Sequence, residues 1–251
     1  MLSPRIIDIE AYINKHGRVT VKELSIHFYL SIETIRRNLQ VLELNGLIKR
    51  VHGGAISLCN VDIGWGFNKR KHAHAIEKKL IAYKALSLIK PGDLIMLDAS
   101  STCWYLAAAL PDKSLTVITN SFRNVLSLSV KKNIKTISIG GEYSARYAAF
   151  VGTTASANIS QYRVDKLFFS CSAYSFISGV WDSNEMNAST KMVMMTSAKQ
   201  KILLADSYKE NLSDIVRICQ ISDLDLILTE KNESDTRQLN RSINKGYNKV
   251  V

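Results

Sequence analysis

The chain has 251 residues, enough for one large domain or for a small and a medium one. Its formal net charge of +11 favours a polyanionic partner. No apolar run approaches the roughly 20 residues needed to span a bilayer, so no membrane partner is expected. Acidic residues interrupt the N-terminus where a signal peptide would be apolar, and the 4 cysteines are scattered without a Cys-x-x-Cys pair. These features favour a reducing, cytoplasmic location and give no indication of a metal site or a cofactor.

Two short amphipathic helices are predicted near the N-terminus. The first is predicted to begin at Ser3 and Pro4, because serine caps a helix and proline suits its first turn, and to end at Gly17. The second is predicted over residues 19–29, where apolar side chains recur at helical spacing. Two short helices followed by a third are typical of a helix-turn-helix.

The third helix, from a cap at Ser31 to Gly46, has the pattern of a recognition helix. Ile35, Leu39 and Leu42 share one face for burial, whereas the polar side chains fall on other faces. A buried stripe with outward arginines suits insertion into a DNA major groove. A solvated surface helix is the simpler interpretation of a lone helix, but the two preceding helices favour DNA binding. A basic segment before a Gly-Gly turn then predicts a wing. The side chains expected to contact DNA are Ser31, Thr34, Arg36, Arg37, Gln40, Lys49, Arg50 and His52.

A linker is predicted after the wing, because residues 58–74 show no clean periodicity. The basic run Lys69–Lys71 within it is expected to contact DNA phosphates. The predicted divisions of the chain are a winged helix-turn-helix DNA-binding domain at 1–57, a linker at 58–74 and an effector-binding domain at 75–251.

From residue 75 the pattern alternates helices with short apolar strands. Strands without polar alternation are typical of a sheet buried on both faces. The alternation predicts an α/β domain with a mostly parallel sheet covered by helices. The predicted helices span residues 75–89, 102–110 and 122–131, and the predicted strands span 94–98, 115–119, 135–139, 166–170, 202–205 and 224–228.

Polar residues follow several of these strands. In open α/β sheets, ligands bind beyond the carboxyl ends of the strands. Ser100, Ser101 and Thr102 precede a helix whose free amides, together with the hydroxyls, could hold a phosphate, and Lys209 would add a positive charge. Each polar group could instead only cap the helix that follows, but their recurrence at several strand ends favours a site. The candidate effector-binding residues are Asp98, Ser100, Ser101, Thr102, Thr119, Asn120, Ser121, Gly140, Gly141, Asp182, Glu185, Lys191, Asp206 and Lys209.

These segments resemble the DeoR family of bacterial transcription regulators over nearly the whole chain. The most specific are Thr34–Leu39 and Arg50–Ala55, which resemble the family's winged helix-turn-helix signature. The resemblance implies a C-terminal sensor of sugar phosphates that is similar in fold to ribose-5-phosphate isomerase. The chain departs from the family at Asn38, where aspartate is usual, and at Ser100, where glycine is usual. These departures concern a helix-stabilising ion pair and the approach of a phosphate to the backbone.

Two further segments, Leu97–Leu106 and Trp181–Asn184, resemble the branch of the family that activates L-fucose operons. That resemblance implies fuculose 1-phosphate as the effector.

The combined prediction is a cytoplasmic regulator, not an enzyme, that binds double-stranded operator DNA and responds to a phosphorylated sugar. Because helix-turn-helix proteins usually bind paired half-sites, a homo-oligomer is expected. The alternative is a sugar-phosphate isomerase with an accessory nucleic-acid-binding domain, for which Asp98, Glu142 or Glu185 would supply the base. An isomerase would not need the N-terminal domain, which favours the regulator. A general RNA-binding protein is disfavoured because the chain lacks an aromatic stacking platform.

Overall fold

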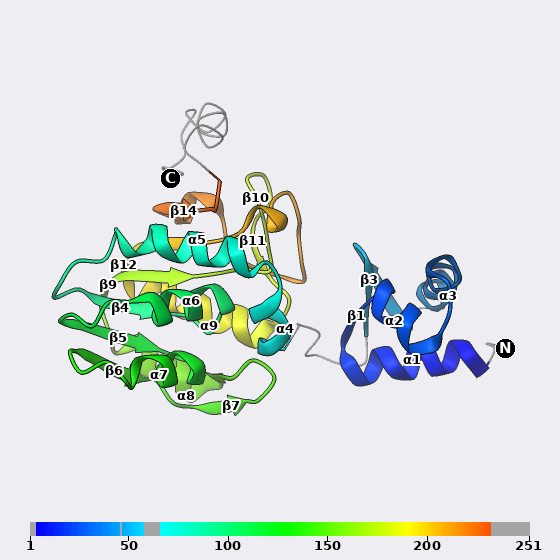
Figure 1. Cartoon of the computed structure of the whole chain (residues 1–251), viewed down its shortest axis with the longest axis horizontal. Helices are drawn as coiled ribbons and strands as arrows, with labels where there is room; N and C mark the ends of the chain where they lie inside the picture. Colours follow the sequence, from blue (N-terminus) through cyan, green and yellow to red (C-terminus); the bar gives the residue numbers. More distant parts are fainter. Residues whose placement is uncertain (1–3, 46, 58–65, 232–251) are drawn as a thin grey trace. The chain divides into compact units, whose positions relative to one another are not determined.

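A computed structural model of the chain describes residues 4–45, 47–57 and 66–231 (Figure 1). The chain divides into two compact units, Met1–Trp65 and Gly66–Val251. The predicted cap at Ser3, the predicted helix end at Gly46 and residues 58–65 of the predicted linker lie outside the described residues. Within the described part, no helix is both long enough and apolar enough to cross a membrane.

The first unit contains a helix-turn-helix and a small antiparallel sheet. The sheet has the strand order β1-β3-β2, and the β2–β3 hairpin is the wing. The predicted winged helix-turn-helix is therefore confirmed. The elements are α1 (Pro4–His16), β1 (Arg18–Thr20), α2 (Val21–Phe28), α3 (Ile32–Leu44), β2 (Ile48–Val51) and β3 (Gly54–Ser57).

The second helix differs from its prediction at its N-terminal end. Residues 18–20 form strand β1, and α2 begins only after Thr20. Thr20 Oγ1 accepts a hydrogen bond from Glu23 N at 3.1 Å, and Glu23 Oε2 accepts one from Thr20 N at 2.7 Å. This reciprocal capping box satisfies two backbone donors that a helix start leaves open. The capping box, and not the apolar periodicity, therefore sets the first residue of α2.

The wing approaches β1 so closely that it requires a glycine. A Cβ atom on Gly54 would lie 2.1 Å from the carbonyl oxygen of Val19. We expect Gly54→Ala to destabilise the protein by about 1–3 kcal/mol, because the strands must separate to admit the methyl group. Chemical unfolding of the full-length chain, followed by circular dichroism, measures the change.

The matched control for this variant is Gly53→Asn in the same turn. Gly53 has a φ of +76° and open space around its Cβ position, and asparagine tolerates that conformation. We expect a near-wild-type unfolding midpoint for the control. The same result for Gly54→Ala would contradict the close contact between β1 and β3.

The second unit is built on a parallel sheet of six strands, in the order β14-β12-β9-β4-β5-β6 (Figure 1). All neighbouring pairs in this sheet are parallel, which confirms the predicted α/β architecture. The sheet strands are β4 (Leu94–Leu97), β5 (Leu115–Thr119), β6 (Ile134–Ser138), β9 (Val164–Phe169), β12 (Ala198–Leu204) and β14 (Leu226–Leu228). The helices are α4 (Phe67–His72), α5 (Ala75–Leu86), α6 (Ser101–Ala109), α7 (Phe122–Leu128), α8 (Gly152–Ser160) and α9 (Glu185–Thr196), with 3-10 turns η1 (Ser207–Lys209) and η2 (Ile221–Asp223).

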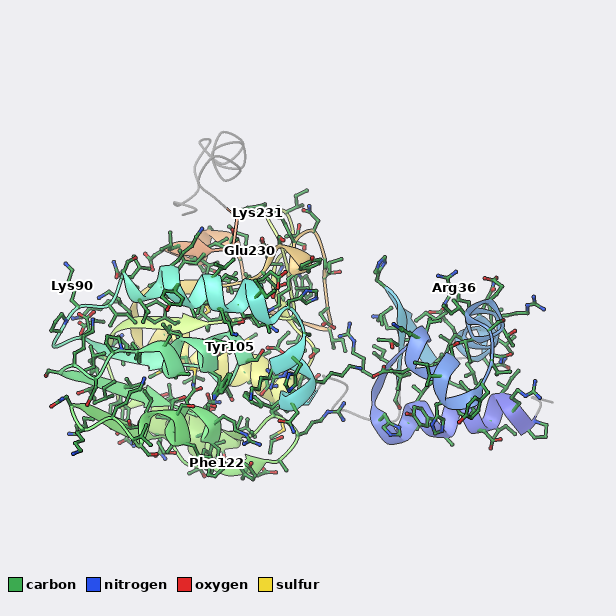
Figure 2. All side chains as sticks on the ribbon, in the orientation of Figure 1. Arg36, Lys90, Tyr105, Phe122, Glu230 and Lys231 are labelled. Atoms are coloured by element: carbon green, nitrogen blue, oxygen red, sulfur yellow. The ribbon has the colours of Figure 1, made fainter. Side chains whose placement is uncertain are left out.

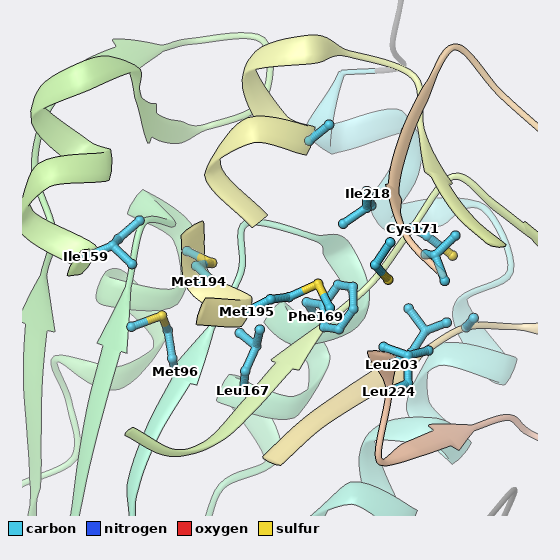
Figure 3. Packing of buried hydrophobic residues seen from close by; sticks show 14 of the residues in the cluster. Met96, Ile159, Leu167, Phe169, Cys171, Met194, Met195, Leu203, Ile218 and Leu224 are labelled. Atoms are coloured by element: carbon cyan, nitrogen blue, oxygen red, sulfur yellow. The ribbon is translucent and has the colours of Figure 1, made fainter. Parts of the chain in front are cut away.

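The sheet separates two hydrophobic cores. Ile95 and Leu97 of β4 pack with α5, α6 and α7 on one face, whereas Met96 packs with α8 and α9 on the other. Figure 3 shows part of this second core, where Met96 and Leu167 lie near Met194 and Met195 of α9. The buried positions of the central strands β4, β5 and β9 are therefore mostly apolar, as a sheet covered on both faces requires. The candidate effector residues Asp98 and Thr119 lie after β4 and at the end of β5.

Short antiparallel strands add to the parallel sheet. They form a β7–β8 hairpin and a second sheet with the order β10-β11-β13. Their bounds are β7 (Glu142–Ser144), β8 (Ala149–Val151), β10 (Ala173–Ser175), β11 (Gly179–Asp182) and β13 (Val216–Cys219). The β10-β11-β13 sheet pairs the segments that follow β9 and β12, whereas the segment after β6 forms its own hairpin.

The predicted linker needs a correction. Its residues 67–72 form helix α4, which belongs to the second unit. Phe67 is buried and lies edge-on to Trp104 of α6, with ring centroids 6.2 Å apart. The Lys71 ammonium lies 4.4 Å from the centre of the Trp104 ring. The basic run Lys69–Lys71, which we expected to contact DNA phosphates, is thus part of a helix packed on the second unit.

Candidate DNA-binding surface and effector site

The recognition helix α3 has the two faces that the sequence predicts. Ile35, Leu39 and Leu42 are buried, with at most 1% of their surface exposed. The predicted base-contacting side chains Arg36, Arg37 and Gln40 are all exposed. Figure 2 shows Arg36 on the outer side of its helix, where it lies 3.7 Å from Glu33. Both arginines are therefore free of the core, which makes them available to a ligand.

The side chains of Ser31 and Thr34 form hydrogen bonds at the start of α3. Ser31 Oγ accepts a hydrogen bond from Thr34 N at 3.2 Å and lies 2.8 Å from Thr34 Oγ1. This is the N-cap that the sequence predicts. A contact of either side chain with DNA stays a prediction.

The wing residues Lys49, Arg50 and His52 are exposed. The wing is tied to the recognition helix through Glu43, near the C-terminal end of α3. Glu43 Oε1 accepts a hydrogen bond from Arg50 N at 2.8 Å, and Glu43 Oε2 lies 3.8 Å from the Arg50 guanidinium. The helix and the wing thus present their basic side chains as one surface.

In the second unit, an ion-pair group lies at the carboxyl ends of the strands. The Lys191 ammonium on α9 donates to Asp182 Oδ2 at the end of β11 and lies 3.4 Å from Asp98 Oδ2 after β4. It also donates to the carbonyl oxygen of Ser170 after β9, at 2.7 Å. All these residues are buried. The structure therefore brings three predicted effector residues from separate segments into one cluster.

Asp98 is held in its charged form. Its burial would by itself raise the pKa, but the charge of Lys191 and the hydrogen bond from Ser100 lower it, and the pKa lies below its usual value. The carboxylate accepts hydrogen bonds from Ser100 N at 3.0 Å and from Ser170 N at 3.1 Å. A depressed pKa makes Asp98 a poor proton acceptor, which disfavours the role of isomerase base. The pKa of Lys191 is raised, because Asp182 and Asp98 outweigh the effect of its burial.

A second charge pair lies beside the first. The Lys209 ammonium lies 3.4 Å from Asp206 Oδ2 and donates to Ser170 Oγ at 3.1 Å. Ser170 therefore touches both charge pairs: its backbone contacts Asp98 and Lys191, and its hydroxyl contacts Lys209. From the sequence, this serine is predicted only as the last residue of the strand over 166–170.

Three of the buried candidate residues carry side-chain oxygens that lack hydrogen-bond partners among the described residues. They are Asp206, through both carboxylate oxygens, Thr102, through its hydroxyl, and Asn120, through its amide oxygen. Asp206 and Thr102 are fully buried, and Asn120 is 3% exposed. Burying an unpaired polar group costs free energy, so such groups are usually satisfied by a bound molecule or by water.

The remaining serine and threonine candidates form hydrogen bonds within the protein, and two of them are helix N-caps. Ser100 Oγ accepts from Cys103 N at 3.1 Å at the start of α6, and Ser121 Oγ accepts from Asn124 N at 3.2 Å at the start of α7. Thr119 Oγ1 donates to Leu97 O at 2.7 Å. Ser101 Oγ donates to the carbonyl oxygen of Arg70 at 3.1 Å. Their direct contact with an effector stays a prediction.

For Glu185, Gly140 and Gly141, the described residues show no contact with the ion-pair group. Glu185 is exposed at the first position of α9. It is not the ion-pair partner of Lys191, which pairs with Asp182 and Asp98. Gly140 and Gly141 follow β6, where Gly141 has a φ of +116° and a Cβ would lie 2.8 Å from Val151 O. The second glycine is therefore needed for the chain to pass β8, whatever else it does.

Lys78, on α5, is a buried charged residue that was not predicted from the sequence. This lysine is 4% exposed, and its ammonium donates to the carbonyl oxygens of Arg70, at 2.6 Å, and Ala73. Burial, together with the charge of Lys209, lowers its pKa to about 8, although Asp206 opposes the shift. The signal was present, since Lys78 shares the helical spacing of the buried residues Ile81, Ala82 and Ala85.

Cysteine and metal chemistry find little support in the described residues. Burial raises the pKa of the Cys171 thiol to about 12, which keeps it protonated and poorly nucleophilic. No group of three or more histidine, cysteine, aspartate or glutamate side chains in the described ranges could hold a metal ion.

A winged helix-turn-helix followed by an α/β unit with a polar cluster at its strand ends is typical of two-domain transcription regulators. Comparison with known families identifies the same two parts. Residues 5–60 match the DeoR-like helix-turn-helix domain, and residues 73–231 match the DeoR C terminal sensor domain. The chain belongs to the DeoR family of transcriptional regulators.

Curated relatives match over most of their length. The L-fucose operon activator of Haemophilus influenzae is 40% identical over 227 residues, which cover 90% of this chain and 91% of the relative. The L-fucose operon activator of Escherichia coli K12 is 37% identical, with 88% and 92% covered. A lactose phosphotransferase system repressor of Staphylococcus epidermidis is 32% identical, with 93% and 94% covered. These relatives are transcription regulators and not enzymes.

A partial similarity to solved structures is also found. Ribose 5-phosphate isomerase A of Methanocaldococcus jannaschii is 16% identical with a TM-score of 0.40, and 53% of each chain is covered. The assignment to a family rests on the sequence matches.

Proposed function

We propose that this protein is a cytoplasmic transcription regulator of a sugar-utilisation operon and that a phosphorylated sugar controls it. In this proposal, the first unit binds double-stranded operator DNA through α3 and the wing. Because an operator commonly has two half-sites, the protein acts as a homo-oligomer. The second unit holds the effector beyond the carboxyl ends of its parallel strands.

The observation that carries this proposal is the buried Asp206 with no hydrogen bond to either carboxylate oxygen, next to the Lys209 ammonium. A carboxylate accepts hydrogen bonds from sugar hydroxyls, and a lysine ammonium binds a phosphate. The unpaired Thr102 hydroxyl lies at position two of α6, where helix-start amides also favour an anion. A small molecule with hydroxyls and a phosphate carries the partners that groups of these kinds require.

The first candidate effector is fuculose 1-phosphate. Relatives at 37–40% identity are named as L-fucose operon activators, which supports this choice. The segment Trp181–Asn184, which resembles the L-fucose branch of the family, contains Asp182 of the ion-pair group.

We expect fuculose 1-phosphate to bind at least about a hundredfold more tightly than free fuculose. A neutral sugar leaves at least two buried polar groups unpaired, at about 1–3 kcal/mol each, and 1.4 kcal/mol corresponds to a factor of ten. Calorimetric titration of the full-length protein with each sugar measures the ratio. Thr102→Val and Lys209→Met should each reduce the preference for the phosphorylated form.

The matched control is Lys135→Met, which removes an exposed lysine from β6 of the same sheet. It should bind both sugars as the wild type does. Equal affinity of the wild type for the two sugars, or an unchanged preference in both site variants, would show that the cluster is not a phosphate site.

A further inference from the structure

The C-terminal end of helix α4 is held by side chains that lie next to the candidate effector site. A helix end leaves its last carbonyl oxygens without partners inside the helix, so they need outside donors. Here the donors come from α5 and α6, which start beside the polar cluster. The contacts are Lys78 Nζ to Arg70 O at 2.6 Å and to Ala73 O, Ser101 Oγ to Arg70 O at 3.1 Å, and Tyr105 OH to Lys71 O at 3.1 Å.

Lys78 is the member of this group that also faces the charges of the site. The groups that act on its ammonium are Lys209, Asp206 and Arg70 from other elements and Glu77 from its own helix. Two contacts place Lys78 beside the candidate site: its ammonium shares the acceptor Arg70 O with Ser101, at the start of α6, and His74, at the start of α5, stacks on Tyr208 in the turn that contains Lys209, with ring centroids 4.0 Å apart. An ammonium has three donors, and the described contacts of Lys78 use two of them. A buried, positively charged site with a donor to spare attracts an anion.

Helix α4 lies where the second unit begins. Helix α4 is the first described element of the second unit, directly after the segment 58–65 that follows the wing. Any ligand that fixes the Lys78 ammonium also fixes the two carbonyl oxygens that this ammonium holds. The effector site and the start of the second unit therefore share one side chain.

We propose that Lys78 binds the phosphate of the effector together with Lys209, and that it thereby couples occupancy of the site to the order of α4. This inference rests on the proposed function, since it assigns a further ligand residue to the same site. Lys78 acts as a binding residue toward the phosphate and as a positioning residue toward α4.

The first test is binding to Lys78→Met, compared with Lys79→Met. The two lysines are neighbours on α5, but Lys79 is exposed. With fuculose 1-phosphate and inorganic phosphate as probes, we expect Lys78→Met to bind at least about tenfold more weakly, because a hydrogen bond to a charged group is lost. Lys79→Met should bind within about twofold of the wild type, since an exposed charge interacts weakly.

The second test distinguishes a ligand contact from a purely structural role. Because the pKa of Lys78 lies at about 8, an anion that binds its charged form draws a proton from solution at pH 8. Calorimetry at pH 8, in two buffers with different ionisation enthalpies, should show proton uptake for the wild type and for Lys79→Met. It should show much less uptake for Lys78→Met, and wild-type affinity should fall as the pH rises above 8.

The third test concerns α4 itself. Amide hydrogen exchange of residues 66–73 should slow when the wild type is saturated with fuculose 1-phosphate, because the ligand fixes the donor of Arg70 O and Ala73 O. The same segment in Lys78→Met should not slow at equal occupancy. If the methionine variant does not fold, Lys78→Gln replaces it, because the amide retains a donor for one of the carbonyl oxygens.

The outcomes separate this inference from the proposed function. A wild type that binds neither probe overturns the phosphorylated effector, and the role of Lys78 falls with it. A wild type that binds, with unchanged affinity and proton uptake in the Lys78 variants, overturns only the role of Lys78. Weaker binding with normal slowing of exchange in α4 overturns the coupling.

Discussion

Replacing Arg36 and Arg37 by alanine is expected to abolish sequence-specific DNA binding and to leave the fold intact. Both side chains are exposed on α3, and its buried stripe does not include them. A bidentate arginine–guanine contact contributes about 1–3 kcal/mol of discrimination. The loss of two such contacts amounts to about 2–6 kcal/mol, or a weakening of about thirtyfold or more. Exposed substitutions of this kind change stability by only about 0.5 kcal/mol.

Gel-shift titrations measure this effect with a DNA fragment that the wild-type protein selects from a random-sequence library. The matched control is Arg5→Ala, which removes an exposed arginine from α1 of the same unit. The control should keep both affinity and sequence preference. Unchanged affinity and preference in the Arg36 and Arg37 variants would remove α3 from its assigned role.

Lys191→Met is expected to destabilise the ligand-free protein by about 3–5 kcal/mol. The substitution leaves Asp98 and Asp182 buried without the cation that both face, and breaking a buried ion pair on one side has a cost of this size. Urea unfolding of the full-length chain at neutral pH measures the loss. The matched control is Lys199→Met: Lys199 lies 2.9 Å from Asp165, but its side chain is 71% exposed, so about 0–1 kcal/mol is expected.

The pH dependence of the same variant gives an independent check. In the wild type, the depressed pKa of Asp98 stabilises the folded state above the unfolded-state pKa, and this contribution is lost as the pH falls below about 4. Without Lys191, burial dominates and raises the pKa of Asp98. The stability difference between wild type and variant should therefore shrink as the pH falls from 7 toward 4. A constant difference over this range would show that the loss comes from packing and not from charge.

The sequence predicts the architecture well where one physical rule dominates. The stripe of Ile35, Leu39 and Leu42 predicts α3 because helical periodicity and burial agree there. The apolar runs at β4 and β5 predict a covered parallel sheet for the same reason. Polar residues at the strand ends also lie together, as the topology of such sheets requires.

The sequence fails where structure depends on contacts between distant segments. Strands such as β1 and β10 have three residues each, too few to show a period. Helix α4 is not predicted because its basic residues are typical of a solvent-exposed segment. In the structure, the buried Phe67 packs α4 on the second unit. The charge pairs are missed in detail because Asp98 and Lys191 are separated by half of the second unit in the sequence.

The contacts of Ser170 differ in how they depend on the side chain. Its backbone N and O serve Asp98 and Lys191, and any amino acid supplies those two atoms. Only the contact with Lys209 requires the hydroxyl. Exchange among small residues at position 170 therefore alters the environment of Lys209 while the Asp98–Lys191 pair persists. At this position, a lineage can change which molecule it recognises while keeping the charge network that its fold depends on.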